Sequence, residues 1–286
     1  MPGAKRRISA IHLIPVLLAC IIGSGSGYIL LASGVSEELG SPFIMEESPR
    51  ATALNTVSFL ALLALGSLLV YVIYRYVKQL LVLLLASSLA LSSAFVYWAH
   101  LVALARVAAL YSWIEALSPH LSAILSLATL FAALKLHRSL VASLALLTFG
   151  ALTGGMLSFM LPSWSILAVL CAASAFDIYS VFRGPISRMI KISHGEGSGV
   201  PGEFKLVIVE FKGLGLGLGD VIFYSMLSSL SLIHPHISLL RWLVVTLAVL
   251  AGAYTTFKLL ERRPLLPALP LPALSGVAAY LVLVGF

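Results

Sequence analysis

Long apolar stretches separated by short polar gaps make up most of this 286-residue chain. A helix needs about 20 largely apolar residues to cross a bilayer. Nine stretches approach this requirement, and they predict membrane-spanning helices at residues 8–33, 51–74, 79–103, 120–136, 139–161, 163–182, 207–232, 237–259 and 267–285. The more polar stretch 104–119 is predicted to be an interfacial turn. The pattern therefore predicts an all-α polytopic membrane protein with about nine spanning helices.

Three segments depart from this pattern. KLVIVEF at 205–211 is rich in β-branched residues, which favours a strand over a helix. The prolines at 264, 267, 270 and 272 predict irregular backbone before the last helix, because proline interrupts helices. The longest polar connection, 183–206, begins with PISRMIKIS, which predicts a short amphipathic helix on the membrane surface. The glycine-rich sequence HGEGSGVPGE that follows predicts a flexible linker.

The composition excludes a water-soluble globular domain. The mean hydropathy is +1.06 and only 10% of the residues are charged, against roughly 25% in soluble domains. The formal charge of +7 does not indicate nucleic acid, because the basic residues stand in the short gaps between apolar runs, where membrane topology explains them. The expected partner is therefore the lipid bilayer and not nucleic acid. Cys20 and Cys171 lie within apolar runs and are expected to be small buried side chains rather than a disulfide.

The distribution of basic residues predicts the orientation. If the N-terminus lies in the cytoplasm, the outer side holds only Arg50, Arg106 and Arg241, and the cytoplasmic side holds the other 15 of the 18 lysines and arginines. Such an excess of cytoplasmic positive charge is the usual determinant of membrane topology. We therefore expect a cytoplasmic N-terminus and an odd number of spanning helices.

The chain has two aspartates, Asp177 and Asp220, and both lie inside predicted spanning helices. An ionisable group inside a membrane is costly and is by default a functional candidate. At a helical rise of 1.5 Å per residue, Asp177 lies roughly 9 Å from Arg183 at the cytoplasmic end of its helix, and Asp220 lies roughly 12 Å from Lys212. The two helices are consecutive and antiparallel, so both carboxyls are expected at a similar depth.

Two carboxyls that face each other do not both ionise easily, so one keeps a proton while the other acts as a base. Such a pair activates water and protonates a leaving amide nitrogen, which is the chemistry of aspartic proteases. Position and rarity alone leave other interpretations open. Each aspartate would equally serve as a hydrogen-bonding group between helices, or as an ion or proton site in a transporter or channel.

A run of alternating glycines at 213, 215, 217 and 219 precedes Asp220. Glycine weakens the commitment of this backbone to a helix and permits close approach of another chain, as a site that holds an unwound peptide requires. A side chain at Gly219 is accordingly expected to crowd the backbone beside Asp220. The alternative is close helix packing through the small residues Gly215 and Gly219.

Three motifs together resemble the presenilin and signal peptide peptidase family of intramembrane aspartyl proteases: FD at 176–177, GLGD at 217–220 and PAL at 267–269. They occur in the order typical of the family and in the last four predicted helices. The resemblance implies that Asp177 and Asp220 are the catalytic pair. It further implies that two motif segments shape the active site and bind substrate: Gly217, Leu218 and Gly219, and Pro267, Ala268 and Leu269.

The resemblance has further implications for organisation and partners. Residues 1–161 would form a scaffold of five helices, and residues 162–286, with the cytoplasmic loop 183–206, would carry the catalytic motifs. Substrates would be membrane-spanning helices of single-span proteins, and the segment before the seventh helix would pair with an extended substrate. Neither a cofactor nor a metal is implied. The small single chain suggests an archaeal cell-membrane homologue that works without partner subunits, and a homo-oligomer is compatible with it.

One residue departs from the family pattern, and one other peptidase family is an alternative. The family usually has tyrosine before the first catalytic aspartate, where this chain has Phe176, so any role of that hydroxyl is missing here. A prepilin-type peptidase is the alternative within proteolysis, because it too carries a GxGD-like motif. The PAL motif and the nine predicted helices favour the presenilin type.

Overall fold

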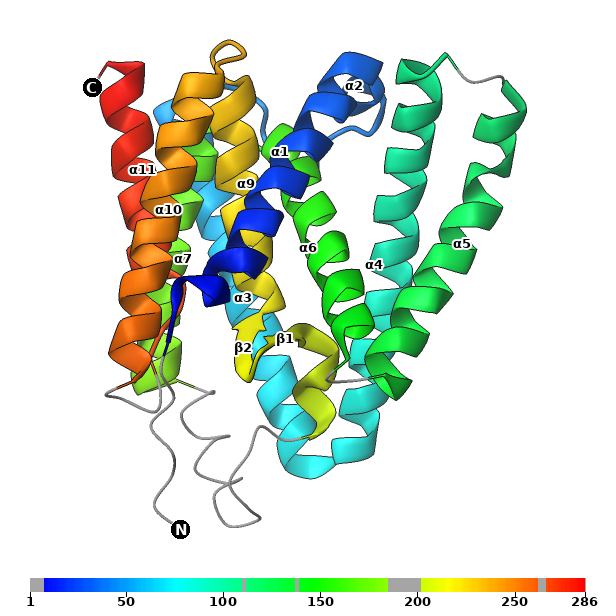
Figure 1. The fold of residues 1–286 in the computed structure, drawn as a ribbon, viewed down its shortest axis with the longest axis vertical. Helices are drawn as coiled ribbons and strands as arrows, with labels where there is room; N and C mark the ends of the chain where they lie inside the picture. The colour runs from blue at the N-terminus through cyan, green and yellow to red at the C-terminus, as the bar shows by residue number, and fades with distance from the viewer. Residues whose placement is uncertain (1–7, 110–111, 137–138, 185–201, 262–265, 286) are drawn as a thin grey trace.

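The computed structural model describes residues 8–109, 112–136, 139–184, 202–261 and 266–285. They form one bundle of helices (Figure 1). The helical elements are η1 (Ala10–Leu13), α1 (Ile14–Ser33), α2 (Val35–Glu38), α3 (Pro49–Tyr76), α4 (Lys78–Val107), α5 (Ser112–Lys135), α6 (Leu140–Met160), α7 (Ser163–Phe182), η2 (Gly202–Val207), α9 (Leu218–Ile233), α10 (Leu239–Leu260) and α11 (Pro270–Val284). A two-stranded sheet, β1 (Ile208–Phe211) and β2 (Leu214–Gly217), stands directly before α9.

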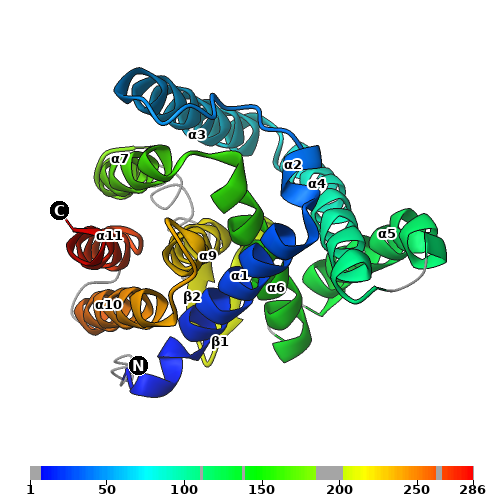
Figure 2. The ribbon, with the colours of Figure 1, turned by 90° about the horizontal axis from the view of Figure 1, so that it is seen from above.

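Helix α9 forms the centre of the bundle. Seen from above, α1 and α6 lie on one side of it and α7, α10 and α11 on the other (Figure 2), and α9 contacts all five. Its side chains from Val221 to Leu232 are almost all buried. In a membrane, neighbouring helices gain little from apolar burial, because lipid tails are equally apolar. Close packing and hydrogen bonds between helices must therefore hold this centre together.

Serine side chains supply many of those hydrogen bonds. The Ser225 hydroxyl donates to the Ala19 carbonyl at 2.9 Å, and the Ser228 hydroxyl donates to the Cys20 carbonyl at 3.1 Å, which ties α9 to α1. The hydroxyls of Ser158 and Ser229 share a hydrogen bond of 2.7 Å between α6 and α9. Small side chains let the helices approach closely enough for these contacts.

Gly154 shows how closely α6 and α9 are packed. A Cβ atom added at this position would lie 2.3 Å from the carbonyl oxygen of Ile222 and 2.9 Å from the backbone nitrogen of Met226. Neither backbone atom can move without moving α9. We expect Gly154→Ala to reduce the free energy of unfolding by about 1–3 kcal/mol, the usual cost of overpacking.

The measurement is the thermal stability of the purified variant in detergent. Gly25→Ala on α1 is the matched control, because a Cβ atom there meets nothing within 4 Å. A melting temperature for Gly154→Ala equal to that of the control would contradict this packing.

Among the described residues, seven helices are long and apolar enough to cross a membrane, which supports an integral multi-pass membrane protein. The other two helices of the predicted set, α9 and α11, have 16 and 15 residues and are shorter than a full span. Non-helical backbone precedes each of them, the hairpin of β1 and β2 before α9 and residues 266–269 before α11. Such backbone is tolerated at membrane depth where protein surrounds it. The total of nine crossings and the cytoplasmic N-terminus stay predictions.

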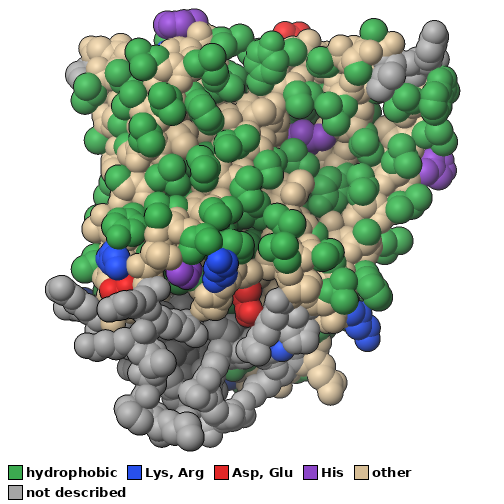
Figure 3. Space-filling model, viewed as in Figure 1, with side chains coloured by type: hydrophobic (Ala, Val, Ile, Leu, Met, Phe, Trp, Pro, Cys, Tyr) green, Lys and Arg blue, Asp and Glu red, His purple; other side chains and the backbone are tan. Residues whose placement is uncertain are grey.

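The lipid-facing surface follows from this architecture. Hydrophobic side chains cover most of the visible face, and most of the Lys, Arg, Asp and Glu side chains seen on this face lie toward the end that carries the hairpin (Figure 3). On α3, Leu62 and Leu65 are exposed to 64% and 63%. Cys20 is buried as expected, but the expectation for Cys171 is wrong, because this residue is exposed on α7. An apolar exterior suits a lipid environment, so apolar sequence alone does not predict burial there.

The predicted interfacial turn at 104–119 is wrong. Helix α4 continues to Val107 and α5 begins at Ser112. The charged residues that made this stretch look non-helical pair with each other at the helix ends. Arg106 donates to Glu38 at 2.8 Å and to Glu115 at 3.0 Å. These partly exposed ion pairs partner the charges at the helix ends.

The strand prediction for 205–211 is correct for its second half, where β1 covers 208–211. The glycine stretch, which was predicted to belong to the seventh helix, forms β2 instead. The two strands are antiparallel, with Val209 opposite Leu216. Lys212 and Gly213 join them with φ of 48° and 80°. Two positive φ angles are characteristic of the tight hairpin turn that matches strand twist.

The prolines near the C-terminus only partly interrupt the helix. Residues 266–269 are irregular as predicted, but Pro270 and Pro272 lie in the first turn of α11. Proline is tolerated there because the first backbone N–H groups of a helix have no partner within the helix. Pro264, the predicted surface helix at 185–193 and residues 194–201 of the predicted linker lie outside the described residues. The last two linker residues, Gly202 and Glu203, begin η2.

Candidate active site

The fold brings the two aspartates together. Asp177 lies near the end of α7 and Asp220 in the first turn of α9, and these two helices are in contact. As whole residues both are half-buried, and they are close enough for the charge of Asp177 to act on Asp220. Two acids from neighbouring helices thus form one site.

The local backbone explains how Asp220 is placed. The residues from Leu214 to Gly217 are extended, and α9 begins at Leu218. The predicted depth of Asp220 assumed a helix from Lys212, so it used the wrong rise per residue for this stretch. The first turn of a helix is a favourable position for a carboxylate, because the helix dipole is positive there.

Gly217 is the glycine that Asp220 requires. The carboxyl group of Asp220 accepts a hydrogen bond from the Gly217 backbone N–H. A Cβ atom at Gly217 would lie 2.9 Å from Oδ2 of Asp220, which is too close for the carboxyl to stay where it is. At Gly219 a Cβ atom meets nothing within 4 Å beyond its own chain neighbours and helix backbone, and the expected crowding of the backbone beside Asp220 stays a prediction. Leu218 packs toward α6, where its side chain lies close to Gly150.

The PAL segment, residues 267–269, completes the site through its backbone. The Leu269 N–H donates to Oδ2 of Asp177 at 3.1 Å, and the Ala268 N–H also donates to this carboxyl group. The side chain of Leu269 itself is 3% exposed and belongs to the core. The contribution of Leu269 to the site in this structure is therefore its N–H group.

Tyr224 is a site residue that the sequence reasoning missed. It lies one helical turn after Asp220 on α9, and its hydroxyl donates to the Ala268 carbonyl at 2.8 Å. The signal was present in the sequence, because residues four apart share one face of a helix. A buried tyrosine also needs a partner for its hydroxyl. The partner itself, a backbone carbonyl 44 positions away, was not visible in the sequence.

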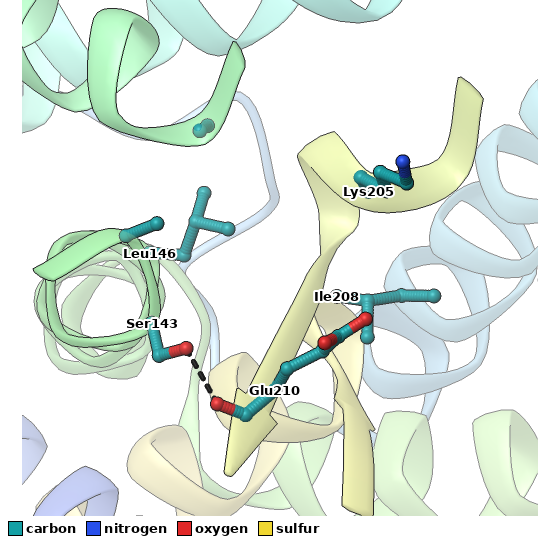
Figure 4. Close-up of a pocket in the computed structure, with 7 residues that line it drawn as sticks. Ser143, Leu146, Lys205, Ile208 and Glu210 are labelled. Atoms are coloured by element: carbon teal, nitrogen blue, oxygen red, sulfur yellow. Dashed lines mark hydrogen bonds between the residues drawn. The ribbon is translucent and has the colours of Figure 1, made fainter. Parts of the chain in front are cut away.

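The hairpin before α9 is attached to the bundle along one edge. The hydroxyl of Ser143 on α6 donates to the Glu210 carbonyl of β1 at 2.5 Å (Figure 4). Between them and Lys205 remains a cavity of about 10 Å³, lined also by Ile208 and Leu146. This volume is about that of a single water probe, so β1 is packed against α6 and leaves no room for a ligand there.

Two larger hollows, of about 580 and 560 Å³, lie at the other end of the molecule. They surround Ser48 and Pro49 at the start of α3, and one of them reaches Trp164 and Ala168. Trp164 stands 13 residues before Asp177 on α7, or roughly 20 Å along the helix. These hollows are therefore separate from the site of the two acids. Within the described ranges, no group of three or more His, Cys, Asp or Glu side chains is placed to hold a metal ion.

Comparison with known proteins shows which fold this chain shares. No family model matches the chain. A segment of 128 residues is 33% identical to Presenilin-B of Dictyostelium discoideum and covers 42% of this chain and 26% of that protein. The structure matches that of a presenilin family intramembrane aspartate protease with a TM-score of 0.64. This is the presenilin fold. The match covers 96% of this chain and 98% of the presenilin-family chain, at 16% sequence identity.

The resemblance indicated by the FD, GLGD and PAL motifs is thereby confirmed, because the presenilin fold extends over nearly the whole chain. The matched segment of Presenilin-B spans about a quarter of that protein, so its whole activity and partners do not transfer directly. The catalytic roles of Asp177 and Asp220, and the division of the chain at residue 161, stay predictions.

Proposed function

We propose that this chain is an intramembrane aspartyl protease that hydrolyses peptide bonds within the spanning segments of single-span membrane proteins. The observation that supports it most is the meeting of Asp177 and Asp220, the only aspartates of the chain, beside the backbone of the PAL segment. The presenilin fold makes proteolysis the favoured use of such a pair over ion coupling.

The proposed chemistry uses one protonated and one ionised carboxyl group. The ionised carboxylate takes a proton from water as the water oxygen attacks the carbonyl carbon of the substrate peptide. The protonated carboxyl stabilises the resulting tetrahedral intermediate by hydrogen bonding. Transfer of a proton to the amide nitrogen then allows the C–N bond to break, which releases a new carboxyl group and a new amine. Because the two groups are coupled, neither step is assigned to one aspartate alone.

An extended substrate would be held by the free edge of β2. A helical peptide bond is shielded by its own hydrogen bonds, so the substrate must be unwound before attack. The outer edge of β1 is occupied by α6, where Ser143 binds the Glu210 carbonyl. Among the residues that the structure describes, strand β2 is paired with β1 alone, and it leads directly into the helix of Asp220. Addition of a substrate strand to β2 would therefore place its backbone beside the acids.

The proposed substrates are single-span proteins whose N-terminus lies outside, as the predicted orientation and the presenilin resemblance imply. We further propose that the chain works without partner subunits, in the cell membrane of an archaeon. Neither a metal nor a cofactor takes part in the proposed reaction. The bilayer itself is the environment in which enzyme and substrate meet, since both expose apolar helices.

The test compares proteolysis with ion transport in the same preparation. The purified chain is reconstituted into liposomes with a single-span peptide, and both peptide cleavage and proton or sodium flux are measured. We expect cleavage that depends on the chain and no flux above empty liposomes. Flux without cleavage would overturn the proposal in favour of an ion-coupled transporter or channel.

A further inference from the structure

The Tyr224 side chain joins the helix of one aspartate to the segment that binds the other. Its ring is 1% exposed, and its hydroxyl donates to the Ala268 carbonyl at 2.8 Å. Both aspartates are near enough to act electrostatically on this hydroxyl. A tyrosine on α9 therefore reaches across the site to the irregular backbone before α11.

The backbone of the PAL segment is hydrogen-bonded to both helices that carry the aspartates. The N–H groups of Ala268 and Leu269 point to the carboxyl of Asp177 on α7, and the carbonyl of Ala268 points to Tyr224 on α9. Adjacent backbone groups thus bind the two helices that carry the acids. An irregular segment has no repeating backbone hydrogen bonds of its own, so side chains that bind it determine where its atoms lie.

We propose that Tyr224 is a positioning residue, whose hydroxyl holds the PAL backbone in the place from which Leu269 binds Asp177. The catalytic effect of this role rests on the proposed proteolysis. The position of the PAL backbone that Tyr224 holds does not depend on it. Without the hydroxyl, the PAL segment loses this hydrogen bond to α9 while the acids and the ring remain. The segment then has to be brought into place in each catalytic cycle.

Thiol labelling tests the positioning without any need for activity. Ala268→Cys is introduced into a chain in which Cys20 and Cys171 are replaced by alanine, and its reaction with a water-soluble thiol reagent is timed. Ala268 is half-buried, so the parent reacts slowly. We expect Tyr224→Phe to accelerate labelling about 2- to 10-fold, the range that corresponds to the loss of one hydrogen bond.

Tyr280→Phe is the matched control. Tyr280 on α11 is 2% exposed, and its hydroxyl is hydrogen-bonded to Nδ1 of His234 at 3.1 Å, outside the PAL contacts. The same chemical change there should lower stability similarly but leave the labelling rate at Ala268→Cys unchanged. If both variants label at the parent rate, or if both accelerate equally, Tyr224 has no specific hold on the PAL segment and the proposal is wrong.

Kinetics supply the second measurement. In the chain with its native Ala268, Tyr224→Phe should lower kcat about 2- to 10-fold with KM unchanged, whereas Tyr280→Phe should retain the parent kcat. A rise in KM alone would overturn the positioning role and assign Tyr224 to substrate binding. If the parent cleaves nothing, the proposed function fails, while the labelling rates still decide the geometry. Should Tyr224→Phe fold poorly, Tyr224→Met keeps an apolar side chain without a donor, and the same labelling comparison applies.

Discussion

Asp177→Asn and Asp220→Asn should each lower the cleavage rate by about 10²- to 10⁴-fold without unfolding the protein. This factor is the contribution typical of acid–base catalysis. Asparagine has nearly the shape of aspartate but neither accepts nor releases a proton at ordinary pH. One carboxyl cannot act as acid and base in the same step, so either substitution removes the function of both. The measurement is the initial cleavage rate of a single-span peptide by purified variants of equal thermal stability.

Glu46→Gln is the control for these variants, because it removes a carboxyl group in the loop before α3, at the other end of the molecule. It should cleave at the parent rate. The parent should also show a bell-shaped dependence of rate on pH, whose two limits belong to the pair jointly. Substantial cleavage by either purified aspartate variant would remove the assignment of Asp177 and Asp220 as the catalytic pair.

Gly217→Ala should lower the cleavage rate by about 10- to 100-fold, because small displacements of a catalytic group have effects of this size. The backbone at this position, with φ of −63° and ψ of 140°, is accessible to alanine, so the helix start is not strained by the change. The new Cβ atom would instead lie 2.9 Å from Oδ2 of Asp220. The carboxyl has to rotate away, and its hydrogen bond to the backbone of residue 217 is lost.

The effect should appear in activity more than in stability, because a side chain rather than a backbone moves. Cleavage rates and melting temperatures are measured for Gly217→Ala and for Gly66→Ala, a substitution on α3 where a Cβ atom meets nothing within 4 Å. Gly66→Ala should match the parent in both. A Gly217→Ala variant as active as the parent would mean that Asp220 functions in a position different from that described.

The long helices were predictable from the sequence because a bilayer leaves few alternatives. A spanning segment must satisfy its own backbone hydrogen bonds, so an apolar stretch of sufficient length becomes a helix. Residues 163–182 were predicted and observed as one helix, and α3, α6 and α10 begin and end within two residues of their predicted bounds. The two aspartates were identified on the same basis, since charge inside a membrane is rare.

The features that were not predicted correctly from the sequence depend on tertiary contacts. The glycine stretch forms a strand because β1 is available beside it, and composition alone indicated only a weak preference for helix. Helices α4 and α5 extend into the predicted turn, where Arg106 pairs with Glu38 on α2 and Glu115 on α5. The contact of Tyr224 with Ala268 joins residues far apart in the chain, which no local pattern predicts.

The most direct measurement of the central claim is the mass of the products formed from a single-span peptide by the parent chain and by Asp220→Asn. If the two aspartates hydrolyse a bond at membrane depth, the parent yields two fragments whose masses sum to that of the substrate plus one water. Their new termini then lie within the spanning segment, and the variant yields no fragments. Fragments cut only outside that segment, or the same fragments from Asp220→Asn, would contradict the account.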